Sequence, residues 1–320
     1  MAEGPEDYPR TAAEFSQRFS TEETCWRYLV ALRWPSGFRC PRCSSVKAWL
    51  IARGRFECRD CGRQVSATAG TIFQDTHKPL RLWFQAMWWV VGQKHGASAL
   101  GLNRVLGIGR YQTAWTWLHK LRRAMVRPGR DRLSGHVEID ETYVGGVEEG
   151  VSGRQTRKKA LVAIAVEYSQ GRLGRARMAR IPDASASSLT RFVQAAVEPG
   201  STVYTDGWEG YNSLSILGYR HKAKAIATSG YPAHVVMPAV HRVASLLKRW
   251  LLGTHQGAVS REHLDYYLDE YTFRFNRRTS RHRGKLFYRL LQQAAAVAPA
   301  PYRTLTKGGV RGPRARSHKR

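Results

Sequence analysis

The clearest pattern of hydrophobic and polar positions lies in the middle of the chain. Residues 136–143 alternate in the manner of a strand, which places Val137 and Ile139 on its inner face. Glu138 and Asp140 then share the opposite face. The alternation therefore predicts a strand that carries two carboxylates on one side.

The residues that follow predict further strands and a helix. Residues 160–167 are almost entirely apolar, as in a central buried strand. We expect another strand over residues 171–181, a helix over 187–197, and a short strand over 202–205 that ends at Asp206. Strands and helices in this order predict an α/β fold with a mixed sheet flanked by helices.

Helical patterns ahead of this segment predict a DNA-binding unit. Residues 97–106 and 110–123 are joined by a turn that contains Gly107 and Gly109, as in a helix-turn-helix. The expected core is Leu100, Ile108, Ala114, Trp117, Leu118 and Leu121. The residues expected to face a major groove are Arg110, Tyr111, Gln112 and Thr113. An ordinary helical hairpin is the alternative.

Four of the five cysteines form two tight pairs, Cys40 with Cys43 and Cys58 with Cys61. Each pair can form a turn that points two thiolates at one place, and fourteen residues separate the pairs. Four thiolates at this spacing predict a closed, structural Zn²⁺ site in a zinc ribbon. A redox Cys-x-x-C motif is the alternative. Cys25 lies in an apolar helical pattern and is expected to be a buried free thiol.

The composition favours a polyanionic partner. The chain has 52 Lys+Arg against 24 Asp+Glu, a formal charge of +28, and such an excess attracts nucleic acid. The alternative is a ribosomal or chromatin-like binder without chemistry, which ten tryptophans and a long α/β segment disfavour. We expect double-stranded DNA as the partner and no small-molecule substrate.

No targeting or membrane segment is visible in the pattern. The N-terminus lacks the basic and apolar regions of a secretory signal. The longest apolar run, residues 82–91, contains Gln85 and is too short to span a bilayer. We therefore expect no membrane partner, reduced cysteines, and a cytoplasmic protein associated with the nucleoid.

Asp140 and Asp206 are the candidate catalytic residues. A phosphodiester repels anionic nucleophiles and has a poor leaving group, and two divalent ions about 3.5–4 Å apart overcome both obstacles. Hard cations such as Mg²⁺ prefer carboxylate oxygens. Asp206 followed by Gly207 would by itself indicate only a turn. Paired with the acidic strand, it predicts an enzyme that cuts or joins DNA.

The order of these features resembles insertion-sequence transposases of the ISXO type. The resemblance covers about residues 15–293 and begins with the zinc ribbon and helix-turn-helix patterns. Its later motifs are VEIDETYVGG (137–146), TDGW (205–208), LLKRW (246–250), GTH (253–255), HL (263–264), YLDE (267–270) and FRFNRR (273–278). The resemblance implies a ribonuclease H-like catalytic domain and cut-and-join chemistry at the ends of a mobile DNA element.

The resemblance also implies a third metal ligand, followed seven residues later by a lysine. With thirty-four residues between it and Asp206, the position falls on His241, and Lys248 has the expected spacing. Histidine departs from the acidic pattern, because imidazole carries no negative charge and suits Mn²⁺ better than Mg²⁺. A structural or solvated histidine is the alternative. Other acidic residues, which break the lysine spacing, are Glu262, Asp265, Asp269 and Glu270.

Basic residues of the C-terminal motifs are candidate DNA contacts. We expect Lys248 beside the cleaved phosphate, with help from Arg249, and further contacts from Arg277 and Arg278. Arg274, Arg281 and Arg283 are candidates of the same kind. Lys248 and Arg249 could instead form the solvated face of an amphipathic helix. By resemblance, related enzymes act as oligomers on DNA.

Five segments are expected along the chain. They are a helical lead-in (1–30), a zinc ribbon (31–75), a helix-turn-helix region (76–128), a catalytic domain (132–290) and a flexible basic tail (291–320). We interpret the whole as a metal-dependent transposase that binds terminal inverted repeats. A catalytically silent DNA-binding regulator and a structure-specific nuclease on the same fold are the alternatives.

Overall fold

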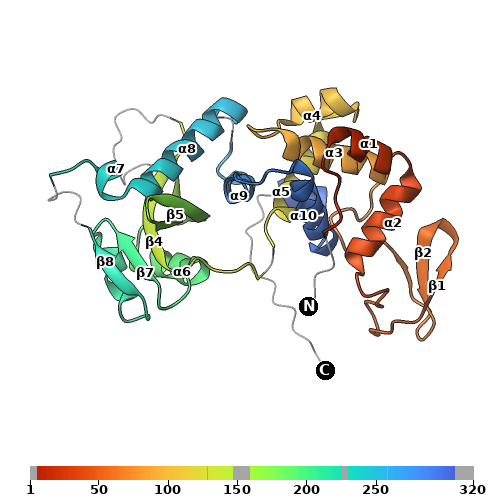
Figure 1. The fold of residues 1–320 in the computed structure, drawn as a ribbon, viewed down its shortest axis with the longest axis horizontal. Helices are drawn as coiled ribbons and strands as arrows, with labels where there is room; N and C mark the ends of the chain where they lie inside the picture. Colours follow the sequence, from red (N-terminus) through yellow and green to blue (C-terminus); the bar gives the residue numbers. More distant parts are fainter. Residues whose placement is uncertain (1–5, 128, 147–158, 225–229, 258, 307–320) are drawn as a thin grey trace.

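The computed structural model describes residues 6–127, 129–146, 159–224, 230–257 and 259–306. They form two bodies (Figure 1). A sheet domain lies at one side of the molecule, and a helical body with the ribbon at its far end lies at the other. The chain crosses between them near residues 127–134 and returns through the last helices.

One apolar core holds the helical body together. Its helices are α1 (Ala12–Arg18), α2 (Glu22–Arg33), α3 (Leu80–Gly92), α4 (Ala99–Leu106), α5 (Tyr111–Ala124) and α10 (Arg283–Ala296). Trp83 of α3 stacks on Trp117 of α5 with 3.7 Å between ring centroids. Phe287 of α10 is fully buried among aromatic rings of α1 and α3. A helix from the end of the chain therefore completes the core begun at its start.

The ribbon is a small antiparallel sheet in the order β1-β2-β3. Its strands are β1 (Ala48–Ile51), β2 (Arg55–Cys58) and β3 (Gln64–Ser66), with a short turn, η1 (Ala52–Gly54), between the first two. Trp26 of α2 stacks on Phe56 and donates a hydrogen bond to the Gly54 carbonyl over 3.2 Å. These contacts fix the ribbon to the helical body.

The five-stranded sheet has the order β6-β5-β4-β7-β8. Its strands are β4 (His136–Val144), β5 (Ala160–Ser169), β6 (Arg172–Ile181), β7 (Thr202–Thr205) and β8 (Arg220–Ala223). β4, β5 and β6 pair antiparallel, whereas β7 runs parallel to β4 and β8 parallel to β7. This order and direction make the domain ribonuclease H-like, and the predicted mixed sheet is confirmed.

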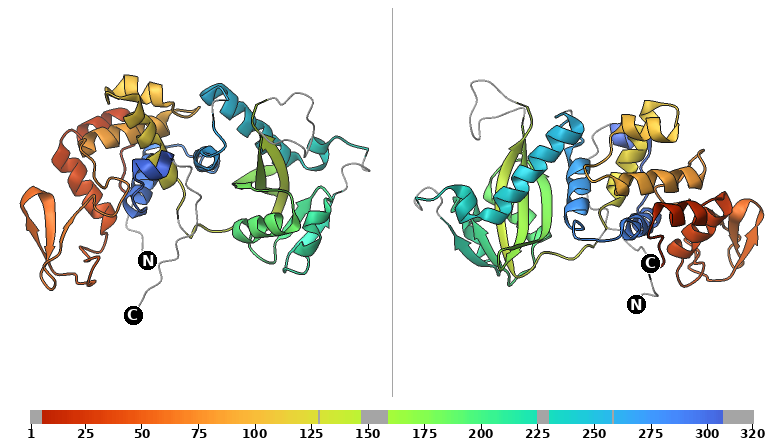
Figure 2. Two further views of the ribbon diagram at one scale, coloured as in Figure 1. Left: turned by 180° about the vertical axis from the view of Figure 1, so that it is seen from behind. Right: turned by 45° about the horizontal axis from the view of Figure 1, so that its top comes forward.

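Helices cover both faces of this sheet. α6 (Ala186–Ala196) and the 3₁₀ turn η3 (Glu209–Leu214) pack on the face that contains Val137 and Ile139. α8 (Pro238–His255) lies across the other face, and α9 (Leu264–Phe275) follows along β6 (Figure 2). The short helices α7 (Ala233–Val236) and α11 (Tyr302–Thr306) complete the elements that bear on the argument. The face that carries Asp140 is therefore also covered.

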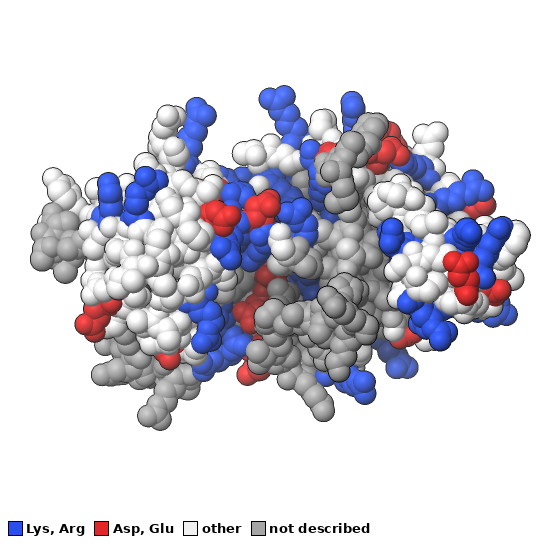
Figure 3. Space-filling view, turned by 90° about the horizontal axis from the view of Figure 1, so that it is seen from below, with Lys and Arg blue, Asp and Glu red and all other residues white. Residues whose placement is uncertain are grey.

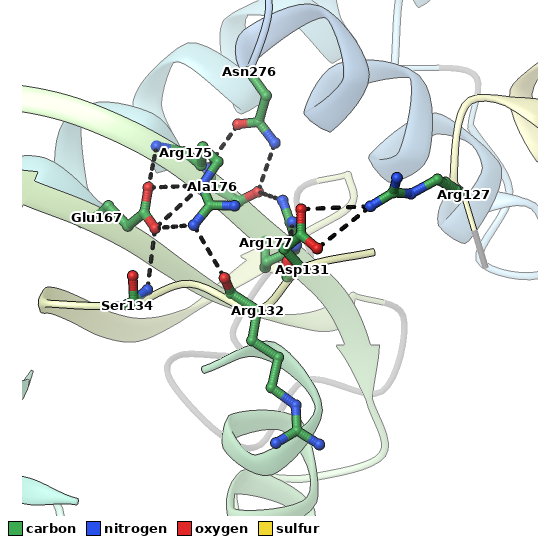
Figure 4. A network of polar contacts seen from close by, with 9 residues as sticks. All are labelled: Arg127, Asp131, Arg132, Ser134, Glu167, Arg175, Ala176, Arg177 and Asn276. Carbon is green, nitrogen blue, oxygen red and sulfur yellow. Dashed lines mark hydrogen bonds and ion pairs between the residues drawn. The ribbon is translucent and has the colours of Figure 1, made fainter. Parts of the chain in front are cut away.

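A polar network fastens the linker and α9 to β6 (Figure 4). Arg177 of β6 donates to the Asp131 carbonyl over 2.6 Å. Arg175 pairs with Glu167 and also donates to the Arg132 carbonyl. Asn276, just past α9, accepts from the Ala176 N–H (2.7 Å) and donates to its carbonyl (3.0 Å). Asn276 thus satisfies backbone groups that an edge strand would otherwise leave open.

A buried ion cluster joins the two bodies. Glu270 of α9 is 1% exposed and accepts from Arg122 of α5 (2.7 Å) and from Arg274 (2.8 and 2.9 Å). Arg274 also donates to the carbonyls of Val90 and Gln93 at the end of α3. The two arginines hold the pKa of Glu270 down to about 2 despite its burial, so the carboxylate stays charged.

Some local expectations differ from the structure. Leu100 is 47% exposed and Leu102 is buried in its place, because α4 turns that face toward the core. No helix among the described residues is long and apolar enough to cross a membrane.

The C-terminal region is ordered further than the expected tail. α10 continues to Ala296 and packs on α2, α3 and α5, away from the sheet. Beyond it, Ala300 and Leu305 are buried beside Tyr266. Residues 307–320 of the expected tail lie outside the described residues.

Candidate active site

Asp140 and Asp206 come from neighbouring parallel strands. Asp140 lies within β4, and Asp206 follows the last residue of β7. Glu138 of β4 pairs with Tyr204 of β7, so the two aspartates lie two residues further along each strand in the same register. Because the two strands are parallel and in register, the aspartates lie at the same level of the sheet, where β7 ends and β4 continues to Val144.

His241 meets Asp140 from the opposite direction. It lies in the first turn of α8, and its Nε2 is 3.7 Å from Oδ2 of Asp140. Among the described residues this nitrogen has no hydrogen-bond partner, although it is shielded from solvent. A buried nitrogen without a partner beside a carboxylate is an arrangement that a cation would complete.

Lys248 lies two turns further along the same helix. Burial raises the pKa of Asp140, and the charge of Lys248 offsets a small part of that rise. Burial, and then the charge of Lys159, lower the pKa of Lys248 itself. A cationic side chain held at a partly desolvated position is suited to a phosphate group that approaches Asp140.

The charges at this site are poorly balanced without a cation. Burial, followed by the negative charge of Glu141, raises the pKa of Asp140 to about 7. Burial also lowers the pKa of His241, with His234 acting in the same direction. Both shifts favour neutral side chains in a metal-free protein. A bound cation would lower the pKa of Asp140 again. It would also accept the free electron pair of the neutral His241 imidazole.

Three supporting residues were not found from the sequence. Glu138 is 2% exposed and accepts a hydrogen bond from the start of α8. Tyr211 donates a hydrogen bond to Glu141 over 2.8 Å. Trp208 donates its backbone N–H to Asp206 over 3.0 Å. The alternation of β4 did place Glu138 on the face of Asp140. What it could not give was the helix that covers that face.

Two of the four acidic alternatives to His241 are engaged elsewhere. Glu270 lies in the buried ion cluster with Arg122 and Arg274, at the junction of the two bodies. Asp265 is 3.6 Å from Arg180 on β6. The structure therefore brings neither carboxylate to Asp140, whereas it does bring His241.

The four ribbon cysteines converge on one point. Their sulfur atoms all lie within 4.8 Å of one another, with 3.6 Å between Cys40 and Cys61 and 3.5 Å between Cys43 and Cys58. Tetrahedral zinc with Zn–S bonds of about 2.3 Å requires sulfur separations of about 3.8 Å. The donor set therefore fits a closed zinc site. Within the described part of the chain, no other His, Cys, Asp or Glu group converges this tightly. Cys25 lies apart from it, fully buried.

The candidate DNA contacts divide into two groups. Arg110, Tyr111 and Gln112 are exposed at the start of α5 and Thr113 is half-buried there, while Arg249 is exposed on α8. Arg277 and Arg278 also contact the protein itself. Arg278 stacks on Phe275 and donates to the Gly174 carbonyl, and burial lowers the pKa of Arg277 to about 10.

Comparison with known protein families agrees with this architecture. Residues 132–276 match a family model described as an ISXO2-like transposase domain, and residues 20–64 match one described as a transposase zinc-ribbon domain. Residues 132–276 are thus similar to an ISXO2-like transposase domain, and a stretch similar to a transposase zinc ribbon precedes them. The transposase match ends at Asn276, where α9 closes against β6, and the ribbon match contains all four cysteines.

A curated relative supports the same family. A Halobacterium salinarum protein described as "Uncharacterized protein in transposable element ISH50" is 29% identical over 290 residues, covering 83% of this chain and 94% of the relative. Among solved structures, a chain in "Crystal structure of the Mos1 Strand Transfer Complex" aligns with 75% of this chain and 82% of its own length. Its identity is 14% and its TM-score 0.26, so the fold assignment rests on the strand order.

Proposed function

We propose that this transposase binds the terminal inverted repeats of its insertion sequence and catalyses divalent-metal-dependent strand cleavage and strand transfer. The observation that carries the proposal is the meeting of Asp140, which lies level with Asp206 in the sheet, with the unpartnered Nε2 of His241. This meeting occurs in a protein of formal charge +28.

Asp140, Asp206 and His241 would hold the catalytic metal ions. Bound Mg²⁺ or Mn²⁺ would supply the charge that activates an attacking oxygen and stabilises a leaving one. Asp140 offers a carboxylate from the centre of the sheet, and His241 offers a nitrogen whose burial keeps it neutral at physiological pH. Tyr211 orients Glu141 beside them through a hydrogen bond.

The reaction consists of two in-line displacements. Water attacks a phosphodiester at the element's end and releases a 3′-hydroxyl, which then attacks a phosphodiester of the target DNA. Each step breaks one P–O bond and forms another, so no covalent bond to the protein is required. Lys248 is placed to bind the phosphate, and Arg249 lies exposed next to it on α8.

DNA would lie across both bodies. Basic side chains are spread over the sheet domain and the helical body on the face seen in Figure 3. The exposed start of α5 offers Arg110, Tyr111 and Gln112 to the major groove of an element end. The ribbon would add contacts to phosphates. Because two ends must be joined, we also propose that the protein acts as an oligomer on DNA.

A catalytically silent DNA-binding regulator is the second candidate. The observation that favours it is His241 itself, because the site has a neutral group where the family pattern expects a carboxylate. Both candidates bind the ends, but only the enzyme cuts them.

Transposition in cells separates these candidates. A marker flanked by the element's own ends is supplied with the wild-type protein or with Asp140→Ala or Asp206→Ala. We expect movement of the marker with wild type and none with either variant, at equal protein levels and equal end binding. A wild-type protein that binds the ends and moves nothing would support the regulator.

A further inference from the structure

The helix that carries His241 begins without a cap of its own. α8 starts after Met237, with Pro238 in its first turn, and no side chain of its own segment caps it. Ala239 and Val240 are buried at the next two positions. Buried backbone N–H groups at a helix start are costly unless another part of the protein accepts their hydrogen bonds.

Glu138 of β4 accepts these hydrogen bonds. Its Oε2 receives the N–H of Ala239 over 2.8 Å and that of Val240 over 3.1 Å. Glu138 is 2% exposed, and its other oxygen lies 4.0 Å from Nζ of Lys224. Lys224 also donates to the Val236 carbonyl, just before α8. A carboxylate at the positive end of the helix is favoured by the helix dipole as well.

This contact ties two candidate metal ligands together. Glu138 lies two residues before Asp140 on the same face of β4, and Val240 immediately precedes His241. Glu138 is therefore linked closely to Asp140 along β4, and to His241 through its hydrogen bond to Val240. The hydrogen bonds fix the start of α8 against β4 beside the point where His241 approaches Asp140.

We propose that Glu138 is a positioning residue that sets the distance between His241 and Asp140, and so the geometry of the catalytic metal centre. The inference rests on the proposed function of those two residues. Glu138 is not offered as a ligand, because one of its oxygens is occupied by two backbone N–H groups. Conserved partners behind a metal ligand act in this way in other metal sites.

The test measures Mn²⁺ binding by the full-length, zinc-loaded protein without DNA, through water-proton relaxation. Glu138→Ala and His241→Ala are each expected to weaken Mn²⁺ binding by about tenfold, as loss of a supporting residue does. If Glu138 acts through His241, the double variant binds Mn²⁺ no more weakly than His241→Ala alone. A purely stabilising role would leave the Mn²⁺ affinity of the folded protein unchanged.

Conservative variants keep the test informative if Glu138→Ala folds poorly. Glu138→Gln retains a carbonyl oxygen at the same reach and should restore Mn²⁺ affinity to within about threefold, inside the usual context dependence of a hydrogen bond. Glu138→Asp retains the charge but is one methylene shorter, and should lose affinity as the alanine variant does. Glu167→Ala, which removes a half-buried carboxylate of β5 that binds Arg175, is the matched control and should bind Mn²⁺ normally.

Two results would overturn the inference. The first is wild-type Mn²⁺ affinity in both Glu138→Ala and Glu138→Asp, together with weaker binding in His241→Ala. This result would show that Glu138 does not position the metal ligands, and it would leave the proposed metal centre unaffected. The second is additive losses in the double variant, which would mean that Glu138 acts independently of His241. If His241→Ala binds Mn²⁺ normally, His241 is not a ligand and the inference about Glu138 is wrong. The transposition assay with Asp140→Ala still tests the proposed enzymatic function separately.

Discussion

The ribbon and the sheet domain assemble their candidate metal sites in opposite ways. The ribbon takes all four sulfur ligands from residues 40–61 and closes them within 4.8 Å. The sheet domain takes its ligands from β4, the end of β7 and the start of α8, which are joined only by the fold. A closed local site stabilises its own module, whereas an open distributed site must be held in place by the rest of the domain.

The two sites also differ in what the protein loses without metal. The ribbon has a core of only Phe38, Val65 and two of the cysteines, so zinc supplies much of its stability. The sheet domain has an apolar core on each face, so its packing does not depend on the candidate ligands. Zinc would therefore stabilise the first region, whereas a cation in the second would offset a charge that the fold disfavours.

The largest expected effect is loss of chemistry without loss of the ribbon. Asp206→Asn should reduce strand cleavage by more than about 100-fold, because removing a ligand exceeds the 10–100-fold loss that its supporting residues cause. Zinc content and end binding should stay at wild-type levels. Cleavage of a labelled element end measures the loss, and Asp183→Asn, an exposed aspartate before α6, is the control. Cleavage at more than a tenth of the wild-type rate would remove Asp206 from the site.

The converse change removes a ribbon ligand. Cys40→Ser should abolish tight zinc binding and expose the amides of β1 to β3 to rapid hydrogen exchange, since zinc contributes about 10–16 kcal/mol in comparable zinc-finger peptides. End binding should weaken, while the amides of β4 and β5 stay protected. Cys25→Ala, at the fully buried cysteine of α2, should retain zinc. Full zinc content and full end binding in Cys40→Ser would contradict the assignment.

The contrast explains what the sequence could predict. The cysteine pairs and the alternation of β4 are local signals: the four sulfur atoms converge as a zinc site requires, and β4 is the strand that the alternation predicted. β7 spans Thr202–Thr205, the residues expected from its short apolar run. The spacing from Asp206 predicted His241 as the third ligand. The seven residues from His241 to Lys248 are about two turns of an α-helix, so both side chains lie on one face of α8.

Long-range packing could not be predicted in this way. Arg274 and Arg278 were expected to contact DNA, and the sequence does not show which groups of the protein they meet. In the structure both bind carbonyl groups, of α3 and β6 respectively. Similarly, α10 follows the catalytic segment but packs in the helical body. The cap of α8 by Glu138 joins residues about 100 positions apart, and only the missing local cap hinted at it.

A smaller effect distinguishes the two regions by stability. Asp140 titrates near 3.8 when unfolded and at about 7 in the folded, metal-free protein. Between these values the folded state binds more protons than the unfolded state, so this group lowers stability as the pH rises. Asp140→Asn should therefore stabilise β4 and β5 at pH 8 by up to about 4 kcal/mol, and hardly at all at pH 4.

Hydrogen exchange of the β4 and β5 amides, in zinc-loaded protein without added Mn²⁺, measures this difference. Saturating Mn²⁺ should remove the advantage of the asparagine variant, because the cation stabilises the charged aspartate of the wild type. Substitution of a ribbon cysteine should instead lower stability, and should do so within the ribbon itself. Equal stability of Asp140→Asn and wild type at pH 8 would show that Asp140 carries no buried charge.

The smallest expected effect concerns metal preference. Wild type should work better with Mn²⁺ than with Mg²⁺, because a neutral imidazole at His241 suits the softer ion. His241→Glu adds a hard, charged oxygen ligand and should move the Mn²⁺-to-Mg²⁺ rate ratio toward Mg²⁺ by about tenfold, whereas His241→Gln, neutral as the imidazole is, should not. Strand-cleavage rates in each metal provide the ratio. Equal wild-type rates in both metals, or an unchanged rate in His241→Ala, would exclude His241 as a ligand. If the Mn²⁺-to-Mg²⁺ rate ratio shifts in His241→Glu and not in His241→Gln, the charge at position 241 determines which ion the site prefers.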